Sequence, residues 1–171
     1  CTFTWDIEKA RFLAHEWRDH SRQEVQIGGG ALGDPGGEFT PGKFTRKGIT
    51  MTSRGCPKRC DFCYAWKREG KIRELEIHPG NLIQDNNLLA CSFSHIEKVF
   101  EMLKSQREVQ FKGGLDMDFM KMWHIDRMRS LRINEIWIAA DEPRDMINAR
   151  KWIPILSKAF SQRKIRCYMI I

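Results

Sequence analysis

Three cysteines stand within eight residues of the sequence, in the segment RGCPKRCDFCY. Cys56, Cys60 and Cys63 are separated by three and then by two residues, and no fourth cysteine lies beside them. Thiolates hold zinc ions and iron–sulfur clusters, and pairs of thiols exchange electrons by forming disulfides. The spacing therefore indicates metal-centred or redox chemistry in this segment.

These chemistries make different demands on the ligands. Structural zinc takes four ligands, so His78 or Cys91 would have to supply the fourth, without the usual paired spacing. A redox pair formed by Cys60 and Cys63 leaves Cys56 unexplained. A four-iron, four-sulfur cluster needs one ligand at each iron, so three thiolates hold three corners and leave the fourth iron open. An open metal position suits catalysis, whereas a saturated one suits structure or electron transfer.

Positive charge is concentrated around the three cysteines. The chain has a formal net charge of +7, and residues 43–73 hold ten Lys or Arg against Asp61 and Glu69, which gives this segment alone a charge of +8. A basic surface of this kind attracts an anionic substrate, a nucleic acid or an acidic redox partner. It is equally typical of a solvated face, so charge alone does not choose among these roles.

The composition is that of a globular protein in a reducing compartment. With 171 residues the chain can bury a core, and no apolar run approaches the roughly 18 residues that cross a bilayer. Cys91 and Cys167 lie in apolar stretches typical of buried free thiols. We therefore expect a cytoplasmic protein with no membrane partner. Because the chain begins at Cys1 rather than Met and ends at Ile171 inside an apolar run, we expect a piece of a longer protein.

Residues 1–42 have the pattern of the end of an α/β unit. Apolar residues at helical spacing predict a helix over 6–20 with Asp6 as its N-cap, and EVQIGG predicts a short strand over 24–29. Seven glycines and two prolines within residues 28–42 then exclude regular structure. We place a domain boundary near Pro41, between segment 1–42 and a second domain over 43–171.

Strands and helices alternate in the second domain. The patterns predict strands over 48–53, 108–116, 133–141 and 164–171, and a further strand within 81–91, at 88–91 or slightly earlier. They predict helices over 94–106, 118–131 and 145–162. Ser94 and Glu97 have the spacing of a capping box. The alternation predicts a parallel sheet, whose functional residues gather where the strands end. Those ends carry the cysteine segment, the turn from Gly113 to Asp116, and Asp141.

The motif C-x3-C-x2-C directly after the first strand of a parallel α/β chain resembles that of the radical SAM enzymes. The resemblance covers about residues 43–171, and Cys56, Cys60 and Cys63 match the ligands of that family's [4Fe-4S] cluster. Phe62 also matches, at a position that lies by the adenine in the family. The resemblance implies a partial, open (β/α) barrel of the TIM type. It also implies that S-adenosylmethionine (SAM) binds the open iron and is cleaved reductively to a 5′-deoxyadenosyl radical that abstracts hydrogen from a substrate.

The resemblance further suggests where the rest of SAM binds. The family usually holds the SAM amino group with a GGE-like turn after the second strand, whereas here FKGGLD follows the third predicted strand. Two sets of residues therefore compete for this role: Gly113, Gly114 and Asp116 in one, and Asp85, Asn86 and Asn87 in the other. A simple strand-to-helix turn is the alternative for the two glycines. Asp141 is a candidate for the ribose hydroxyls or the substrate, or for the cap of the next helix.

Partners and rivals follow from the same residues. An acidic electron donor such as flavodoxin or ferredoxin, and an anionic substrate, would suit the basic segment. Segment 1–42 resembles, more weakly, the end of the cobalamin-binding, Rossmann-like domain that precedes some radical SAM domains, although His15 and His20 lack that domain's ligand motif. A rival hypothesis is a zinc-stabilised, basic nucleic-acid-binding module that uses the three cysteines and His78. His124 is interpreted as a satisfied polar residue of a Met-rich helix rather than as a catalytic residue.

Overall fold

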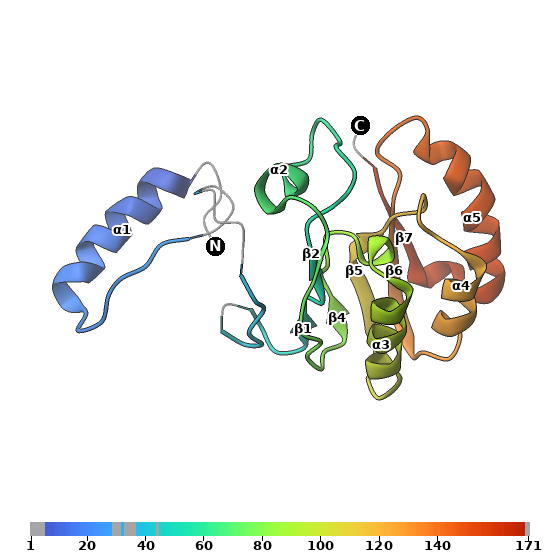
Figure 1. Ribbon diagram of the computed structural model, residues 1–171, viewed down its shortest axis with the longest axis horizontal. Helices are drawn as coiled ribbons and strands as arrows, with labels where there is room; N and C mark the ends of the chain where they lie inside the picture. The colour runs from blue at the N-terminus through green and yellow to red at the C-terminus, as the bar shows by residue number, and fades with distance from the viewer. Residues whose placement is uncertain (1–5, 29–31, 33–36, 44, 170–171) are drawn as a thin grey trace.

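A computed structural model describes residues 6–28, 32, 37–43 and 45–169 (Figure 1). Its main element is a five-stranded sheet with the order β1-β4-β5-β6-β7, in which every neighbouring pair is parallel. The strands are β1 (Ile49–Thr50), β4 (Leu82–Ile83), β5 (Val109–Leu115), β6 (Ile133–Ala139) and β7 (Ile165–Tyr168). The predicted α/β class with a parallel sheet is confirmed.

Three helices join successive strands of this sheet. α3 (Phe93–Lys104) joins β4 to β5, α4 (Met122–Met128) joins β5 to β6, and α5 (Asp145–Ala159) joins β6 to β7, with the 3₁₀ turn η4 (Gln162–Lys164) before β7. Each connection advances by one strand, and crossovers of this kind are right-handed, so all three helices fall on the same face of the sheet (Figure 1).

α3 begins earlier than the capping pattern predicts. Ser92 is its N-cap, and the Ser92 hydroxyl accepts a hydrogen bond from the backbone N–H of His95 at 3.2 Å. The predicted capping box of Ser94 and Glu97 is therefore wrong, because a serine two residues earlier takes the extended conformation that a cap requires.

The second strand of the sheet also differs from the prediction. The strand predicted within 81–91 is present, but it is β4, at the start of that segment, whereas residues 88–90 form a 3₁₀ turn, η3 (Leu88–Ala90). Leu88 and Leu89 are nevertheless buried, at 1% and 4% exposure, because the turn packs both side chains onto the core. A short apolar run does not distinguish a strand from a helical turn, and pairing with β1 and β5 selected Leu82 and Ile83 instead.

The core lies between the sheet and its three helices. Alternate residues of β5 and β6 point into it, and Val109, Phe111, Ile136 and Ile138 are almost completely buried. The opposite face of the sheet is partly exposed and polar. There Trp137 stacks on Tyr168 with ring centroids 4.4 Å apart, the indole N–H donates to Glu135 at 2.8 Å, and Glu135 also pairs with Lys112.

The N-terminal helix α1 (Ile7–His20) lies apart from the sheet (Figure 1). Its predicted extent is confirmed, although the Asp6 side chain makes no capping hydrogen bond. The strand expected over 24–29 is not formed in residues 24–28, and Gly29 lies outside the described residues, as do 30, 31 and 33–36 of the glycine-rich segment. Trp17 is 62% exposed. No helix within the described ranges has both the length and the apolar character needed to cross a membrane.

Candidate functional site at the carboxyl edge of the sheet

The three cysteines lie on a loop that closes on itself. β2 (Ser53–Arg54) and β3 (Arg73–Glu74) pair in antiparallel fashion, and we call residues 55–72 between them the cysteine loop. The backbone N–H of Cys56 donates to the Gly70 carbonyl at 3.1 Å, and a short helix, α2 (Ala65–Glu69), completes the loop. Since β2 follows β1 after two residues, the loop stands at the carboxyl edge of the sheet.

Gly55 sets the entrance of the cysteine loop. Its φ of +83° is in the left-handed region, and a Cβ there would lie 2.2 Å from the Lys71 carbonyl oxygen, so only glycine fits. Its N–H donates both to Glu69 and to the side-chain oxygen of Asn86, each at 3.1 Å. Glu69 is buried and also pairs with Arg54 at 3.4 Å, so the loop has its own polar core.

All three cysteines of the loop are free thiols with partly buried side chains. The Cys63 N–H donates to the Cys60 carbonyl at 3.1 Å, and the Trp66 indole N–H donates to the same carbonyl at 3.0 Å. Burial, together with a hydrogen bond to Glu142 and its negative charge, raises the pKa of the Cys60 thiol to about 11, against the opposing charge of Lys58. The Cys60 thiol is therefore protonated at neutral pH, and a metal that takes it as a ligand must displace that proton.

Asp85, directly after β4 and Gln84, ties two strand ends together. The carboxylate is 2% exposed and accepts hydrogen bonds from the Thr52 N–H and hydroxyl, each at 2.6 Å, and from the Ser53 hydroxyl at 2.8 Å. Burial raises the pKa of Asp85, although the donors from Thr52 and Ser53 oppose the shift. Asp85 thus holds the segment that leads into the cysteine loop against β4.

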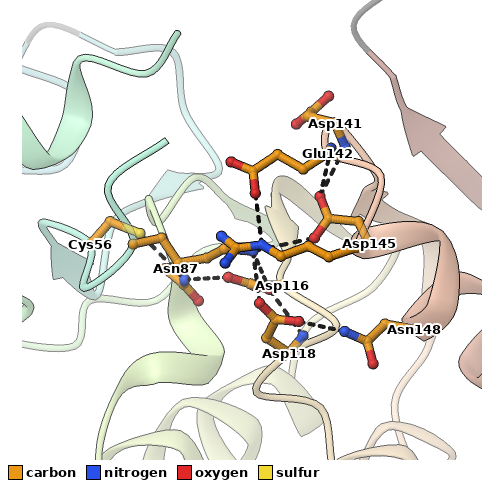
Figure 2. Close-up of polar contacts among 10 residues, drawn as sticks. Cys56, Asn87, Asp116, Asp118, Asp141, Glu142, Asp145 and Asn148 are labelled. Carbon is orange, nitrogen blue, oxygen red and sulfur yellow. Dashed lines mark hydrogen bonds and ion pairs between the residues drawn. The ribbon is translucent and has the colours of Figure 1, made fainter. Parts of the chain in front are cut away.

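Asn87 connects the cysteine loop to the segment after β5. Its side-chain N–H donates to Cys56 Sγ at 3.4 Å and to the Asp116 carboxylate at 3.0 Å (Figure 2). The amide is 2% exposed, and its oxygen has no hydrogen-bond partner among the described residues. Of the candidates after β4, Asn87 is therefore the residue that contacts both a cysteine and the rival set after β5.

Gly113 and Gly114 lie within β5, so the predicted turn at these two residues is wrong. The register against β6 shifts between Phe111 and Leu115, which makes this stretch irregular. A Cβ on Gly113 would lie 2.0 Å from the Asp85 carbonyl oxygen. The glycine therefore allows β5 to approach the segment after β4, and this brings Asp116 close to Asn87.

Lys58, between the first two cysteines, is held by three carboxylates. Its ammonium lies 2.9 Å from Asp118, 3.4 Å from Asp116 and 3.4 Å from Asp145. Burial alone would lower the pKa of Lys58, but the hydrogen bond to Asp118 and the charges of the other two carboxylates outweigh it, so the pKa is raised. Lys58 thus joins the cysteine loop to the ends of β5 and β6.

The end of β6 contributes acidic residues through a tight turn. The Asp145 carboxylate accepts from the backbone N–H groups of Asp141 and Glu142 at 3.1 and 3.0 Å (Figure 2). α5 begins at Asp145, so the alternative of Asp141 as its cap is wrong, because the helix starts four residues later. Glu142 pairs with Arg144 at 2.7 Å. Phe62, on the cysteine loop, is 45% exposed.

The carboxyl edge therefore brings together residues from four separate segments. Cys56, Asn87 and Asp116, all named from the sequence, form one chain of contacts. Lys58, Asp118 and Asp145 were missed, although the position of Lys58 between two cysteines was a signal. Among the described residues, no group of three or more His, Cys, Asp or Glu side chains is arranged to hold a single metal ion.

Comparisons with known proteins assign no family to this chain. A scan against protein-family models, a search of curated proteins and a search of solved structures each returned no match.

Proposed function

We propose that residues 43–171 form the core of a radical SAM enzyme, in which Cys56, Cys60 and Cys63 hold a [4Fe-4S] cluster. The observation that carries the proposal is the cysteine loop itself, with three free thiols on one closed loop at the carboxyl end of the first parallel strand. When bound, the cluster and SAM would supply reductive cleavage of the sulfonium and a 5′-deoxyadenosyl radical for hydrogen abstraction.

The donor set fits such a cluster better than it fits a zinc ion. Soft thiolates are the ligands that iron–sulfur clusters use, and a cluster spaces its thiolates more widely than a single ion does. The zinc alternative needs His78 or Cys91 as its fourth ligand. The Thr50 hydroxyl donates to the His78 carbonyl at 2.9 Å, so the His78 backbone lies beside β1, whereas the cysteine loop begins beyond the end of that strand. Cys91 is buried, and burial raises the pKa of its thiol to about 12.

The sheet supports the barrel part of the proposal. Its strands follow one another in sequence order with no reversal, whereas a doubly wound sheet reverses its order near the middle. A (β/α) barrel needs this sequential order, with all helices outside. The polar face with Lys112, Glu135 and Trp137 would then be the inner face of a partial, open barrel.

The residues around the cysteines would tune and orient the bound groups. The Asn87 amide donates to Cys56 Sγ, and hydrogen bonds to a ligating sulfur make a cluster easier to reduce. Asp116 and the unpartnered Asn87 oxygen are the acceptors that would take the SAM amino group. Phe62, being partly exposed on the loop, is free to pack against the adenine, and Asp141 remains a candidate for the ribose.

The basic face of the cysteine loop would receive an electron donor. Arg59, Lys67 and Lys71 are exposed there, and Lys67 lies 5.3 Å from the Tyr64 ring centroid. An acidic protein such as flavodoxin or ferredoxin would complement this charge, as would an anionic substrate. The free thiols suit a reducing, cytoplasmic setting. Cobalamin is not part of the proposal, because His15 and His20 are exposed on α1 without a ligand motif.

Anaerobic reconstitution with iron and sulfide tests the proposal. We expect a brown protein with about four irons and four sulfides per chain. The Cys60→Ala variant should lose most of both. Cys167 is exposed, so its expected burial is wrong, and Cys167→Ala, distant in sequence from the loop, should load like the parent chain. A colourless protein that binds one zinc ion, or full loading of Cys60→Ala, would refute the ligand assignment.

A further inference from the structure

The cysteine loop carries two aromatic rings beside two cations. Tyr64 directly precedes α2, and Trp66 and Lys67 belong to this helix. The Lys67 ammonium lies 5.3 Å from the centroid of the Tyr64 ring and 5.2 Å from that of the Trp66 ring. The Arg59 guanidinium lies 5.9 Å from the centroid of the Trp66 ring. We call Arg59, Tyr64, Trp66 and Lys67 the aromatic–basic patch.

The two cations of the patch have no counter-charge within the described chain. Arg54 and Lys58, nearby in sequence, pair with carboxylates of the protein. In contrast, no carboxylate among the described residues forms an ion pair with Arg59 or Lys67. Contacts with ring faces stabilise these cations without neutralising them. Both side chains are exposed, so an anionic molecule can reach them.

The rings of the patch are held in place and accessible to a partner. The Trp66 indole N–H donates to the Cys60 carbonyl at 3.0 Å, and the backbone N–H of Arg68 donates to the Tyr64 carbonyl at 2.9 Å. The Trp66 side chain is partly buried, whereas Tyr64 is 73% exposed. The Tyr64 ring therefore offers an open face beside an unneutralised positive charge.

The rings distinguish between two partners that would both complement the charge. Nucleic acid bases stack on aromatic side chains, and every base can do so because each has a π-face. The carboxylates of an acidic protein gain nothing from a ring face, which is itself electron-rich. A duplex keeps its base faces stacked on one another, whereas a single strand leaves them free. The patch therefore fits a single strand best.

We propose that the aromatic–basic patch binds single-stranded nucleic acid. A base stacks on the Tyr64 ring, and Arg59 and Lys67 contact the phosphates beside that base. Stacking and phosphate contacts do not read base edges, so binding tolerates different sequences. It needs neither the cluster nor SAM, so this inference goes beyond the proposed function and can fail separately from it.

Fluorescence anisotropy on the full chain without cluster tests the patch with three labelled probes. They are dodecathymidylate, an abasic strand with the same number of phosphates, and an oligoglutamate peptide of matched charge. Dodecathymidylate should bind at least about fivefold more tightly than the abasic strand, because one stacked base contributes that much. It should also bind more tightly than the peptide. Equal affinity for the two strands would overturn the proposal, and a peptide that binds as tightly as dodecathymidylate would assign the patch to an acidic protein instead.

Replacing the exposed ring locates the stacking. Tyr64→Leu should weaken dodecathymidylate about fivefold and leave the abasic strand unchanged, because only the base uses the ring. Phe12→Leu, at a 62% exposed position on α1, is the matched control and should change neither strand. If Tyr64→Leu affects both strands alike, or behaves like Phe12→Leu, the assignment of the ring fails.

Replacing one cation locates the phosphate contact. Lys67→Gln, at an exposed position, should weaken both strands. It should also make the plot of log affinity against log salt concentration shallower by about 0.7, the value for one phosphate contact on a single strand. Lys158→Gln, at an exposed position of α5, is the matched control. A salt dependence that is the same in the two variants would show that Lys67 does not contact phosphate.

Discussion

The two ends of the strand order, the β1–β4 side and the β5–β6–β7 side, are held together by different forces. On the β5–β6–β7 side, β5 and β6 have seven residues each, and their inward side chains are buried apolar groups such as Phe111 and Ile136. On the β1–β4 side each strand has two residues, and buried polar contacts hold the segments that follow the strands together. There Asp85 holds Thr52 and Ser53, and Glu69 with Asn86 holds Gly55.

The fold therefore separates the contacts that stabilise the sheet from the contacts that set the geometry of the site. Apolar burial is strong but non-directional, so it supplies a firm support without fixing the path of a loop. Hydrogen bonds from buried groups are directional, and they fix the cysteine loop at the cost of depending on every partner. Lys58 and Asn87 cross between the two sides, which puts the cysteines against the acidic ends of β5 and β6.

Truncating the apolar side should have the largest effect. Ile136 is fully buried in β6, and Ile136→Ala should lower the free energy of unfolding by about 4 kcal/mol, through lost burial and a residual cavity. Urea unfolding followed by circular dichroism measures this loss. Asn134→Ala, at an exposed position of the same strand, should change it by less than about 0.5 kcal/mol. Equal losses in the two variants would show that apolar burial does not hold the β5–β6–β7 side together.

Removing the central polar contact of the other side should cost somewhat less. Asp85→Ala leaves the Thr52 N–H and two hydroxyls without their acceptor in a buried place, so we expect a loss of about 3 kcal/mol. Limited proteolysis should also cut the cysteine loop faster than in the parent chain. Asp126→Ala, at an exposed site on α4, is the control. An Asp85→Ala variant as stable and as resistant to protease as this control would show that polar contacts do not hold the β1–β4 side.

The connection between the sides should have a moderate effect. Lys58→Met leaves three carboxylates close together without their cation, and partial exposure screens their repulsion, so we expect a loss of about 1 to 2 kcal/mol. Lys67→Met, on the exposed part of the same loop, should lose much less. Thermal unfolding of the two variants side by side makes the comparison. A larger loss of thermal stability in Lys67→Met than in Lys58→Met would show that Lys58 does not connect the two sides.

The smallest effect should come from the polar face of the sheet, and it should depend on pH. The hydrogen bond and charge of Lys112, with the Trp137 N–H, lower the pKa of Glu135 below its ordinary value of 4.5. A depressed carboxyl pKa contributes stability above the unfolded pKa, and that contribution is lost as the pH falls through the folded pKa. Glu135→Gln should therefore cost about 0.5 kcal/mol at pH 7, and the difference should shrink as the pH falls below about 4.5 and through the folded pKa. A difference that grows on acidification would contradict the assigned sign.

The sequence allowed prediction of those parts that local patterns determine. Apolar periodicity identified β6 and α5, and the rule that parallel strands end at one edge grouped the cysteine loop with Asp116. Asn87, which contacts both, was named only from the family resemblance. The register of the strands could not be predicted from the sequence. The irregular pairing around Gly113 and the choice of Leu82 for β4 depend on strands that pair across the sheet, and no local pattern encodes them. The contacts of Lys58 with Asp118 and Asp145 follow from that register.

Addition of SAM to the reduced, reconstituted protein tests whether three thiolates hold a cluster with one open iron. We expect SAM to shift the electron paramagnetic resonance signal of the reduced cluster, and 5′-deoxyadenosine to form. Cys60→Ala should give neither result, and Cys167→Ala should give both. A fully loaded cluster whose signal does not respond to SAM, with no 5′-deoxyadenosine formed, would contradict the account.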